Sequence, residues 1–594
     1  MKKSVILLLS AAAVLAGCEK DALLIPSPDS NYGGEGTVDG GSTGIVTPGT
    51  NEDDLIDGVS FARTITIVFS DSADAAVTGD ENGVVKVNGN QVTVDNTAFD
   101  EIVKYVLSGS CANGSFKVYS GNKQAFVLDG LSLTSPDGPA INNQGKKRCF
   151  LVLKGENMLA DAGAAAYATE GEEDAKAVLF SEGQVIVSGD GSLEVSARNA
   201  LGKSAVSSDD YLYITGTPVL KVTAGSGAGH GLRGKDYVRI AGGTLEVTTQ
   251  ADMKKGINSD GFVLIEDGSV TVTVTGGTAY DEEDMEYTGS ACIKADNYFG
   301  MTGGIVTLTN SGAGGKGIRA GNYDYYAANS GLYDSYITGG TLKVSTTGAE
   351  SHDVSAKAIK IGFKEGSGRS YLYAGNLLVS GGSTVVTCSK GEAVEAKGNI
   401  TVSDGALYAT SSKDDAINCQ GEMNVTGGYV YGYSSGNDGI DTNGNLVLSG
   451  GYTFGVTTKG TPEVGLDANT EGGYKLYIKS GATVVAYGGL ESGYSSAQNV
   501  YSMSCTAGGW NALHDGSTYF VAFKAPSGVS SVAVSAPSLN KGFTGVSVEQ
   551  SVCNEIWGVN GISGGKEVSL STYSGGNGPG GGGPGYPGGP GWPW

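Results

Sequence analysis

The chain has 594 residues and a formal net charge of −24 at pH 7, from 62 acidic and 38 basic side chains. This charge opposes binding to a phosphate backbone, so we expect no nucleic-acid partner. Glycine accounts for 99 residues without a collagen period, and alternating runs of Val, Ile, Thr, Tyr and Leu far outnumber helical patterns. The composition therefore predicts a large all-β protein.

The first residues predict export. Lys2 and Lys3 precede the apolar run VILLLSAAAVLA, which is too short for a stable membrane span. The run ends in LAGC, which resembles the bacterial lipobox and implies cleavage before Cys18 and acylation of that cysteine. The alternative is an ordinary signal peptide with a chance cysteine. We expect residues 1–17 to be a lipoprotein signal peptide, and the rest to be anchored by lipid at the outer membrane or cell surface.

Low-complexity sequence flanks the folded part. Residues 18–60 are rich in Gly, Ser, Thr, Pro and Asp, which predicts a flexible stalk. The Gly/Pro-rich residues 574–594 predict a disordered tail.

Between these segments, a small residue followed by a branched aliphatic one recurs, with several successive copies about 23 to 26 residues apart. Periods of this length indicate stacked repeats, and the short strands with Gly, Asn and Asp turns predict a right-handed parallel β-helix over residues 61–490. Residues 61–150 would form its N-terminal cap and first coils, and residues 491–573 a small C-terminal β module. The branched residues would point inward as an aliphatic ladder: Val206, Leu232, Ile257, Ile293, Ile318, Ile359, Val394, Ile417, Ile440 and Leu466.

The cysteines and histidines limit the chemistry. Without Cys18, seven cysteines remain, with no close pairing, so we expect no disulfide framework. Only three histidines occur, which leaves little material for a zinc site or a histidine-based triad.

Two sets of motifs are distinctive: YVLSGSCANGSFKVYSG with FVLDGLSLTSPDGPAINN, and the repeated KGIxxxG with ITGGTLxV. Together they resemble a family of secreted bacterial carbohydrate-binding β-helix proteins with a pectate-lyase-like fold. The resemblance covers about residues 61–490. It implies binding of cellulose and of acidic, pectin-type polysaccharides, with calcium in the structure.

A charged column is predicted directly after the aliphatic ladder, pointing outward. It changes from basic to acidic between Lys360 and Glu395. The basic part could pair with uronate carboxylates, with Arg319 and Lys360 as the main candidates, or it could be a solvated stripe that pairs with loop acids. Its members are Arg233, Asn258, Lys294, Arg319, Lys360, Glu395, Asn418, Asp441 and Asp467.

The acidic part predicts calcium, because it offers the oxygen ligands that this ion prefers. The alternatives for these residues are turn chemistry and a hydrated acidic face. The candidate ligands are Asp414, Asp415, Asn418, Asp438, Asp441 and Asp467.

Aromatic residues recur every 23 residues on the other side of each repeat. We predict that they form an exposed strip that stacks on sugar rings. The alternative is an aromatic stack covered by a loop or by the C-terminal module. The residues are Tyr408, Tyr431 and Phe454 in one row, and Tyr429 and Tyr452 in a second.

These patterns predict a lipid-anchored, non-catalytic polysaccharide-binding protein that contains calcium. A polysaccharide lyase is the first alternative, with Arg319 or Lys360 as a base near a calcium-bound uronate. The constellation looks incomplete, because both residues lie several repeats from the acidic cluster. A surface adhesin or structural spacer is the second alternative. The sequence leaves open the particular glycan and the oligomeric state.

Overall fold

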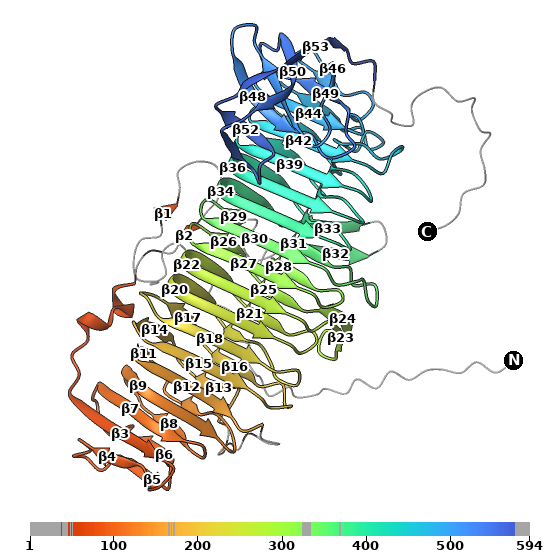
Figure 1. Cartoon of the computed structure of the whole chain (residues 1–594). Helices are drawn as coiled ribbons and strands as arrows, with labels where there is room; N and C mark the ends of the chain where they lie inside the picture. The colour runs from red at the N-terminus through yellow and green to blue at the C-terminus, as the bar shows by residue number, and fades with distance from the viewer. Residues whose placement is uncertain are drawn as a thin grey trace, which may run out of the picture.

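The computed structural model describes residues 37–38, 46–47, 49, 51–163, 167, 169, 171, 173–322, 334–367 and 370–575. Parallel strands stack along one long axis, with the earliest strands at one end and a separate group of late strands at the other (Figure 1). Within the described ranges there is no α-helix, only two 3-10 helices, η1 (Glu52–Asp54) and η2 (Ile56–Gly58). The prediction of an all-β protein is confirmed. No helix in these ranges has the length and apolar character needed to cross a membrane.

One sheet has 14 strands and follows the stacking axis. Its strands are parallel except at the first pair, β5 with β6, which is antiparallel. In spatial order the strands are β5 (Val85–Asn88), β6 (Gln91–Asp95), β8 (Ser115–Tyr119), β10 (Ile141–Asn143), β13 (Ala177–Ser181), β16 (Ser204–Ser208), β19 (Leu232–Gly234), β21 (Lys255–Ser259), β25 (Ala291–Ala295), β28 (Lys316–Ala320), β31 (Lys357–Ile361), β35 (Val394–Ala396), β37 (Ile417–Cys419) and β40 (Ile440–Thr442).

The aliphatic ladder is confirmed. Its ten residues, from Val206 to Leu466, lie opposite one another in consecutive strands or bridges. Each is at most 3% exposed, so the repeat period translates into a continuous apolar core. The described cysteines from Cys111 onward are all free, as predicted.

The second sheet corrects the predicted fold, because its pairings close on themselves. The long strand β9 (Gln124–Ser135) pairs with β11 through its first part and with β12 through its second, and β20 (Tyr237–Thr249) does the same with β17 and β18. The circuit runs β9, β11 (Cys149–Lys154), β14 (Val185–Gly189), β17 (Leu212–Ile214), β20, β18 (Val219–Ala224), β15 (Ser192–Ala197), β12 (Glu156–Asp161) and back to β9. This sheet is a closed, largely parallel barrel with further strands, and the prediction of a right-handed parallel β-helix is wrong.

The physical reason lies at the Gly-rich corners. The sequence pattern treats each Gly-Gly pair as a turn between two strands, but several long strands continue through the corner with a register shift. Gly243 takes φ +78° at such a corner, a conformation that L side chains rarely adopt. Because the strand is not interrupted, it joins two faces into one sheet.

The further strands of the closed sheet extend it toward both ends of the stack. They are β3 (Arg63–Ser70), β4 (Ala76–Thr78), β7 (Val103–Cys111), β22 (Phe262–Val274), β26 (Phe299–Met301), β27 (Ile305–Asn310), β29 (Ser335–Ile337), β30 (Thr341–Thr346), β34 (Leu377–Cys388), β36 (Ile400–Ser411), β38 (Met423–Val425), β39 (Tyr429–Ser434), β41 (Leu446–Leu448), β42 (Tyr452–Thr457), β43 (Leu476–Ile478), β44 (Thr483–Tyr487), β45 (Ser495–Ser496), β46 (Tyr501–Ser504), β49 (Ser531–Ser535) and β54 (Leu570–Thr572).

Three two-stranded hairpins lie outside these sheets: β1 (Thr37–Val38) with β2 (Val46–Thr47), β23 (Thr278–Asp281) with β24 (Glu286–Gly289), and β32 (Phe363–Ser367) with β33 (Ser370–Ala374).

The N-terminal segment is ordered earlier than the predicted boundary at residue 60. Asp54 in η1 is 5% exposed, accepts a hydrogen bond from Arg148 Nε at 2.8 Å and another from the hydroxyl of Tyr211. Tyr211 begins a stack of buried rings that continues with Tyr237 at 4.4 Å and Phe262 at 4.8 Å between ring centroids. A buried charge-assisted hydrogen bond thus fastens η1 to the barrel. Cys18, the predicted signal peptide and residues 576–594 of the predicted tail lie outside the described residues.

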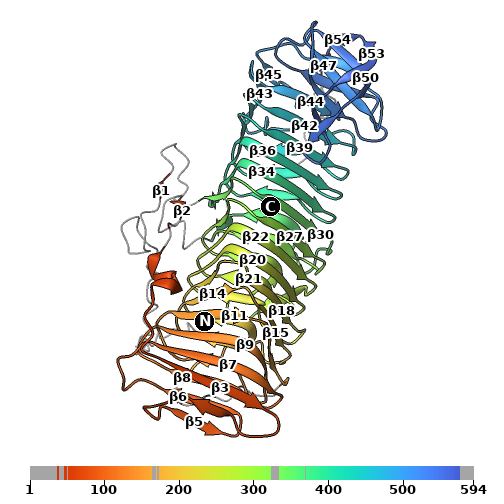
Figure 2. The same ribbon diagram turned by 60° about the vertical axis from the view of Figure 1, so that its left-hand side comes forward.

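The C-terminal module packs on the end of the stack, as Figure 2 shows from a second side. Its antiparallel sheet has the order β51 (Gln550–Val552), β52 (Trp557–Asn560), β48 (Tyr519–Lys524), β47 (Trp510–His514), β50 (Lys541–Ser547) and β53 (Ser563–Val568). Trp557 is fully buried, and its indole N–H donates to the carbonyl of Val430 at 3.4 Å. The module therefore covers the aromatic side of the last repeats.

Candidate functional site

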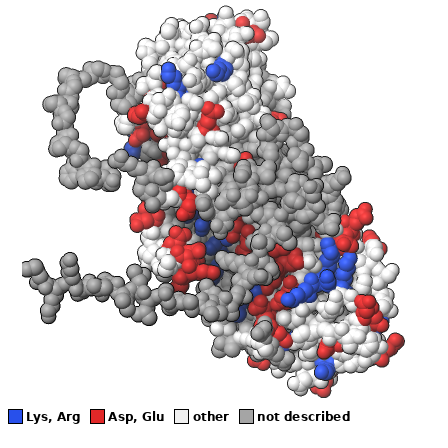
Figure 3. Space-filling view, turned by 180° about the vertical axis from the view of Figure 1, so that it is seen from behind, with Lys and Arg blue, Asp and Glu red and all other residues white. Residues whose placement is uncertain are grey.

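The charged column exists as the sequence predicts. Its members from Arg233 to Asp441 lie opposite one another on the outer side of the 14-stranded sheet, one per strand. Adjacent strands are about 4.8 Å apart, so neighbouring charges are close. Charged side chains also gather near the N-terminal end of the face in Figure 3, while the C-terminal module shows few.

The basic half contains two cations without a carboxylate partner. Lys294 pairs with Asp296 at 2.7 Å and is therefore neutralised. Arg319 Nη1 donates to the Thr288 hydroxyl at 3.2 Å, and Lys360 lies in the next strand. In the described ranges neither Arg319 nor Lys360 has an Asp or Glu oxygen within 4.0 Å. We call these two residues the Arg–Lys pair.

Lysines next to the Arg–Lys pair concentrate the positive charge. Burial and the neighbouring Lys360 lower the pKa of Lys316 to about 7, although Lys316 Nζ donates to the carbonyls of Gly314 at 2.6 Å and Ser355 at 2.7 Å. Burial and Arg319 likewise lower the pKa of Lys360 to about 8. These shifts have the sign of a place that an anion would stabilise.

Ion pairs mark the change of sign along the column. Lys357 Nζ lies 2.7 Å from carboxylate oxygens of both Glu392 and Glu395, and Lys397 pairs with Glu395 as well. Burial opposes ionisation of Glu395, but Lys357 and Lys397 outweigh it and lower the pKa of this carboxyl. The boundary is therefore internally neutralised.

The acidic cluster beyond this boundary consists of the predicted calcium ligands Asp414, Asp415, Asn418, Asp438, Asp441 and Asp467. No Lys or Arg of the described part lies within ion-pair distance of its carboxylates. Burial and then Asp441 raise the pKa of Asp415 to about 8, and burial raises that of Asp438 to about 7. Asn418 Nδ2 donates to Asp415 at 3.0 Å, but this neutral group does not replace a counter-charge.

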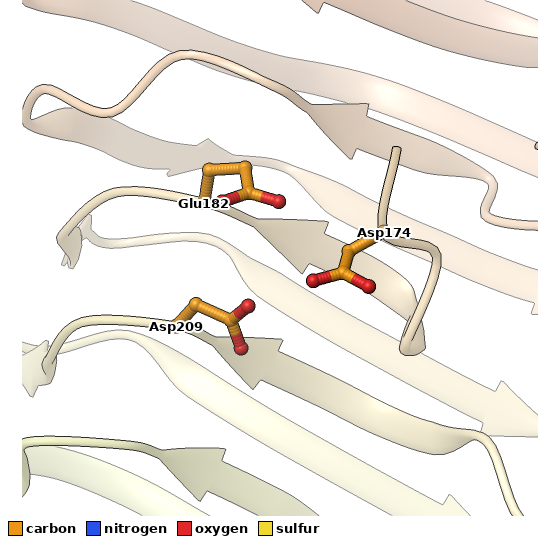
Figure 4. A group of neighbouring side chains, drawn as sticks. All are labelled: Asp174, Glu182 and Asp209. Atoms are coloured by element: carbon orange, nitrogen blue, oxygen red, sulfur yellow. The ribbon is translucent and has the colours of Figure 1, made fainter. Parts of the chain in front are cut away.

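The acidic cluster supplies the oxygen chemistry of a calcium site, but its ligand atoms do not converge. In the part of the chain described, the carboxylates that come within 4.8 Å of one another as a group of three are Asp174, Glu182 and Asp209 instead (Figure 4). Lys176 Nζ already lies 2.7 Å from Asp174 and also pairs with Asp209. An ammonium group thus takes the position that a metal ion would need.

The aromatic rows are in register as predicted, but the prediction of an exposed strip is wrong for Tyr431 and Phe454, whereas Tyr408, Tyr429 and Tyr452 are partly exposed. Tyr408 stacks on Tyr431 with ring centroids 5.0 Å apart, and Tyr429 stacks on Tyr452 at 4.8 Å. Tyr431 is 3% exposed and Phe454 is fully buried. The C-terminal module covers them, because these rings form a shared apolar core with Trp557 and Phe523.

Part of the first row opens into a recess of about 540 Å³ at the edge of the module. Tyr408, Tyr431 and Tyr433 line it from the stack, and Lys524 and Asn554 line it from the module. Sugar stacking on Phe454 is excluded by its burial, whereas Tyr408 keeps partial access to solvent.

A larger groove, of about 850 Å³, lies beside the turns that follow β35, β37 and β40. We call it the tyrosine–amide groove. Tyr371 and Tyr373 of β33 line it together with Tyr474, and side-chain amides line its floor. The amide residues are Asn376, Asn399, Gln420, Asn443 and Asn469.

Sequence reasoning missed this groove. The amides at Gln420 and Asn443 fall at the same point of consecutive repeats, 23 residues apart, but a polar residue beside a glycine there indicates only a turn. Tyr371 and Tyr474 lie in insertions between repeats and follow no period, so only the three-dimensional structure brings them to the amides.

Comparisons with known proteins agree with a carbohydrate-related role. A family model described as carbohydrate-binding domain-containing protein matches residues 88–431, more than half of the chain. No curated protein matches significantly. A solved structure of the polysaccharide lyase-like protein from C. thermocellum, a gadolinium derivative, is 23% identical with a TM-score of 0.34, over 44% of this chain and 95% of that one. This structural similarity is too low to bear on fold or function.

The acidic cluster predicts a pH-dependent stability. Asp438 has a pKa near 7 in the folded protein against 3.8 as its ordinary value, so its stabilising contribution is complete below about pH 3.8 and is lost as the pH rises through about 7. Asp438→Asn keeps an acceptor for the Val464 N–H and removes the charge. The variant should lose less stability than the wild type between pH 5 and pH 8, by on the order of a few kcal/mol.

Melting temperatures at the two pH values measure this difference. The exposed Asp190→Asn serves as the control and should follow the wild type. Equal losses of stability in Asp438→Asn and wild type would show that the pKa of Asp438 is not raised in the folded protein.

Proposed function

The chain belongs to the family of carbohydrate-binding domain-containing proteins, and on this premise we propose a lipid-anchored, non-catalytic protein that binds acidic, pectin-like polysaccharides. The observation that carries the acidic preference is the Arg–Lys pair. Among the described residues, two neighbouring cations on an outward sheet face lack a carboxylate partner, and Lys316 adds a further cationic group beside them.

A uronate is the sugar whose charge complements this pair. The planar guanidinium of Arg319 can donate two parallel hydrogen bonds to one carboxylate, and the ammonium of Lys360 adds a point charge in the next strand. Binding an anion also relieves the repulsion between Lys360 and Arg319. The pair therefore binds and orients a charged sugar without any bond being broken.

The binding proposal predicts a loss of affinity in Arg319→Ala/Lys360→Ala. Retardation in polygalacturonate gels should weaken at least about tenfold, because hydrogen bonds to charged groups each contribute about 1.5–3 kcal/mol. Retardation of the wild type should also fall as salt rises. Lys221→Ala/Lys343→Ala removes the same charge from the other sheet and should behave as wild type.

Each alternative gives a different result. No retardation on any glycan would favour the adhesin or spacer. Unsaturated products appearing in polygalacturonate with calcium would replace the proposal by a lyase, whereas we expect none.

The proposal includes calcium at the acidic cluster, supported by its oxygen donors, its raised pKa values and the lack of Lys or Arg partners among the described residues. An ion would have to draw together carboxylates that do not converge in this structure. CaCl2 should raise the melting temperature of the wild type more at pH 8 than at pH 5, where protons already neutralise the cluster. The increase should shrink in Asp438→Asn. An increase that NaCl of equal ionic strength reproduces would rule out a specific calcium site.

Anchoring through Cys18 rests on the sequence alone. Cys18→Ser should move the protein from the detergent phase to the aqueous phase in Triton X-114 partition of the producing cells. Partition that does not change in the variant would refute the lipid anchor.

A further inference from the structure

We propose that the tyrosine–amide groove is a second subsite, which binds an uncharged stretch of polysaccharide separately from the Arg–Lys pair. This inference rests on the proposed function, because it assigns a further sugar-binding surface to the same protein. It is carried by three features of the groove: exposed rings, amides without a side-chain hydrogen bond within the described ranges, and a lining whose charged residue, Lys397, is ion-paired.

The rings are available to a ligand. Tyr371 is 42% exposed and Tyr474 is 44% exposed, although both line a groove. Lys364 Nζ lies 4.0 Å from the ring centroid of Tyr371 and holds this ring in place. An exposed, oriented ring is suited to packing against the apolar face of a pyranose.

The Tyr474 ring is also placed by the fold. Asn469 builds the turn that carries it, since its side-chain oxygen accepts the Gly472 N–H at 2.7 Å and its carbonyl accepts the Tyr474 N–H at 3.0 Å. Tyr474 therefore approaches the groove from the last repeats, while Tyr371 approaches from the β32–β33 hairpin.

The amides on the floor fall into two groups. The carbonyl oxygens of Asn376 and Asn399 accept backbone N–H groups of the next repeat at 2.7 and 2.8 Å, so they hold the turns together. Gln420 and Asn443 make no side-chain hydrogen bond within the described ranges. Each amide therefore offers two donors and an acceptor to ligand hydroxyl groups.

The two amides without a side-chain hydrogen bond occupy equivalent positions in consecutive repeats. Gln420 and Asn443 directly follow Cys419 and Thr442, which lie opposite one another in β37 and β40. The backbones of the two residues are thus about one strand spacing, 4.8 Å, apart.

The lining of the groove favours an uncharged ligand, because rings and side-chain amides supply most of its contacts. Lys397 is the charged residue among those that line it, and its ammonium pairs with Glu395. Lys364 lies outside the lining, with its ammonium over the Tyr371 ring. Neutral sugars would bind here through stacking and hydroxyl contacts.

Affinity electrophoresis of the full chain in galactomannan, hydroxyethyl cellulose and polygalacturonate tests the inference. Tyr371→Ala/Tyr474→Ala and Gln420→Ala/Asn443→Ala should each weaken retardation on at least one neutral glycan about tenfold and leave polygalacturonate unchanged. Arg319→Ala/Lys360→Ala should do the reverse. Tyr280→Ala, a 49% exposed tyrosine on the β23–β24 hairpin, is the matched control.

The results separate this inference from the proposed function. Retardation of the wild type on polygalacturonate alone would overturn the neutral subsite and keep the acidic one. Neutral-glycan retardation that survives in both groove variants would place that binding elsewhere. The substituted groups are solvent-accessible, and circular dichroism verifies that the variants fold.

Discussion

The in-register stacking of parallel strands is the constraint on which the other features depend. Each hydrogen-bonded step places equivalent residues of consecutive repeats about 4.8 Å apart. The aliphatic ladder satisfies this geometry at no cost, because identical apolar side chains pack well on one another. The same geometry brings equivalent polar residues together, so a charge that recurs with the repeat lies next to a charge of the same sign.

The protein resolves these repeated charges in two ways. At the outer basic positions, acids from adjoining turns neutralise the column, as Asp260 does for Arg233 at 2.8 Å. At the boundary, the sign changes within one strand step and the two halves neutralise each other through Lys357. Neither solution reaches the Arg–Lys pair or the acidic cluster. Those are the places where pKa values of lysines fall and those of aspartates rise, as expected where a counter-charge is missing.

The sequence was sufficient to predict the features that recur with the repeat period. The aliphatic ladder, the charged column and the stacked aromatic rows all appear in the predicted register, because a fixed spacing between residues determines which side chains become neighbours. What failed depends on contacts that no period encodes. Closure of the larger sheet follows from strands that continue through Gly243 instead of ending there. Burial of Phe454 follows from a module some hundred residues later in the chain, whose Trp557 shares no pattern with the repeats.

The two candidate sugar surfaces also differ in how far the repeat period determines them. The Arg–Lys pair belongs to the repeat and was predicted, whereas the tyrosine–amide groove combines repeated amides with rings from insertions. Glu395 lies between them: it follows Lys360 in the charged column and binds Lys397, which lines the groove. By pairing with Lys397, Glu395 neutralises the charged residue that lines the groove. The proposed acidic subsite and the proposed neutral subsite therefore differ in charge, although they share this carboxylate as a neighbour.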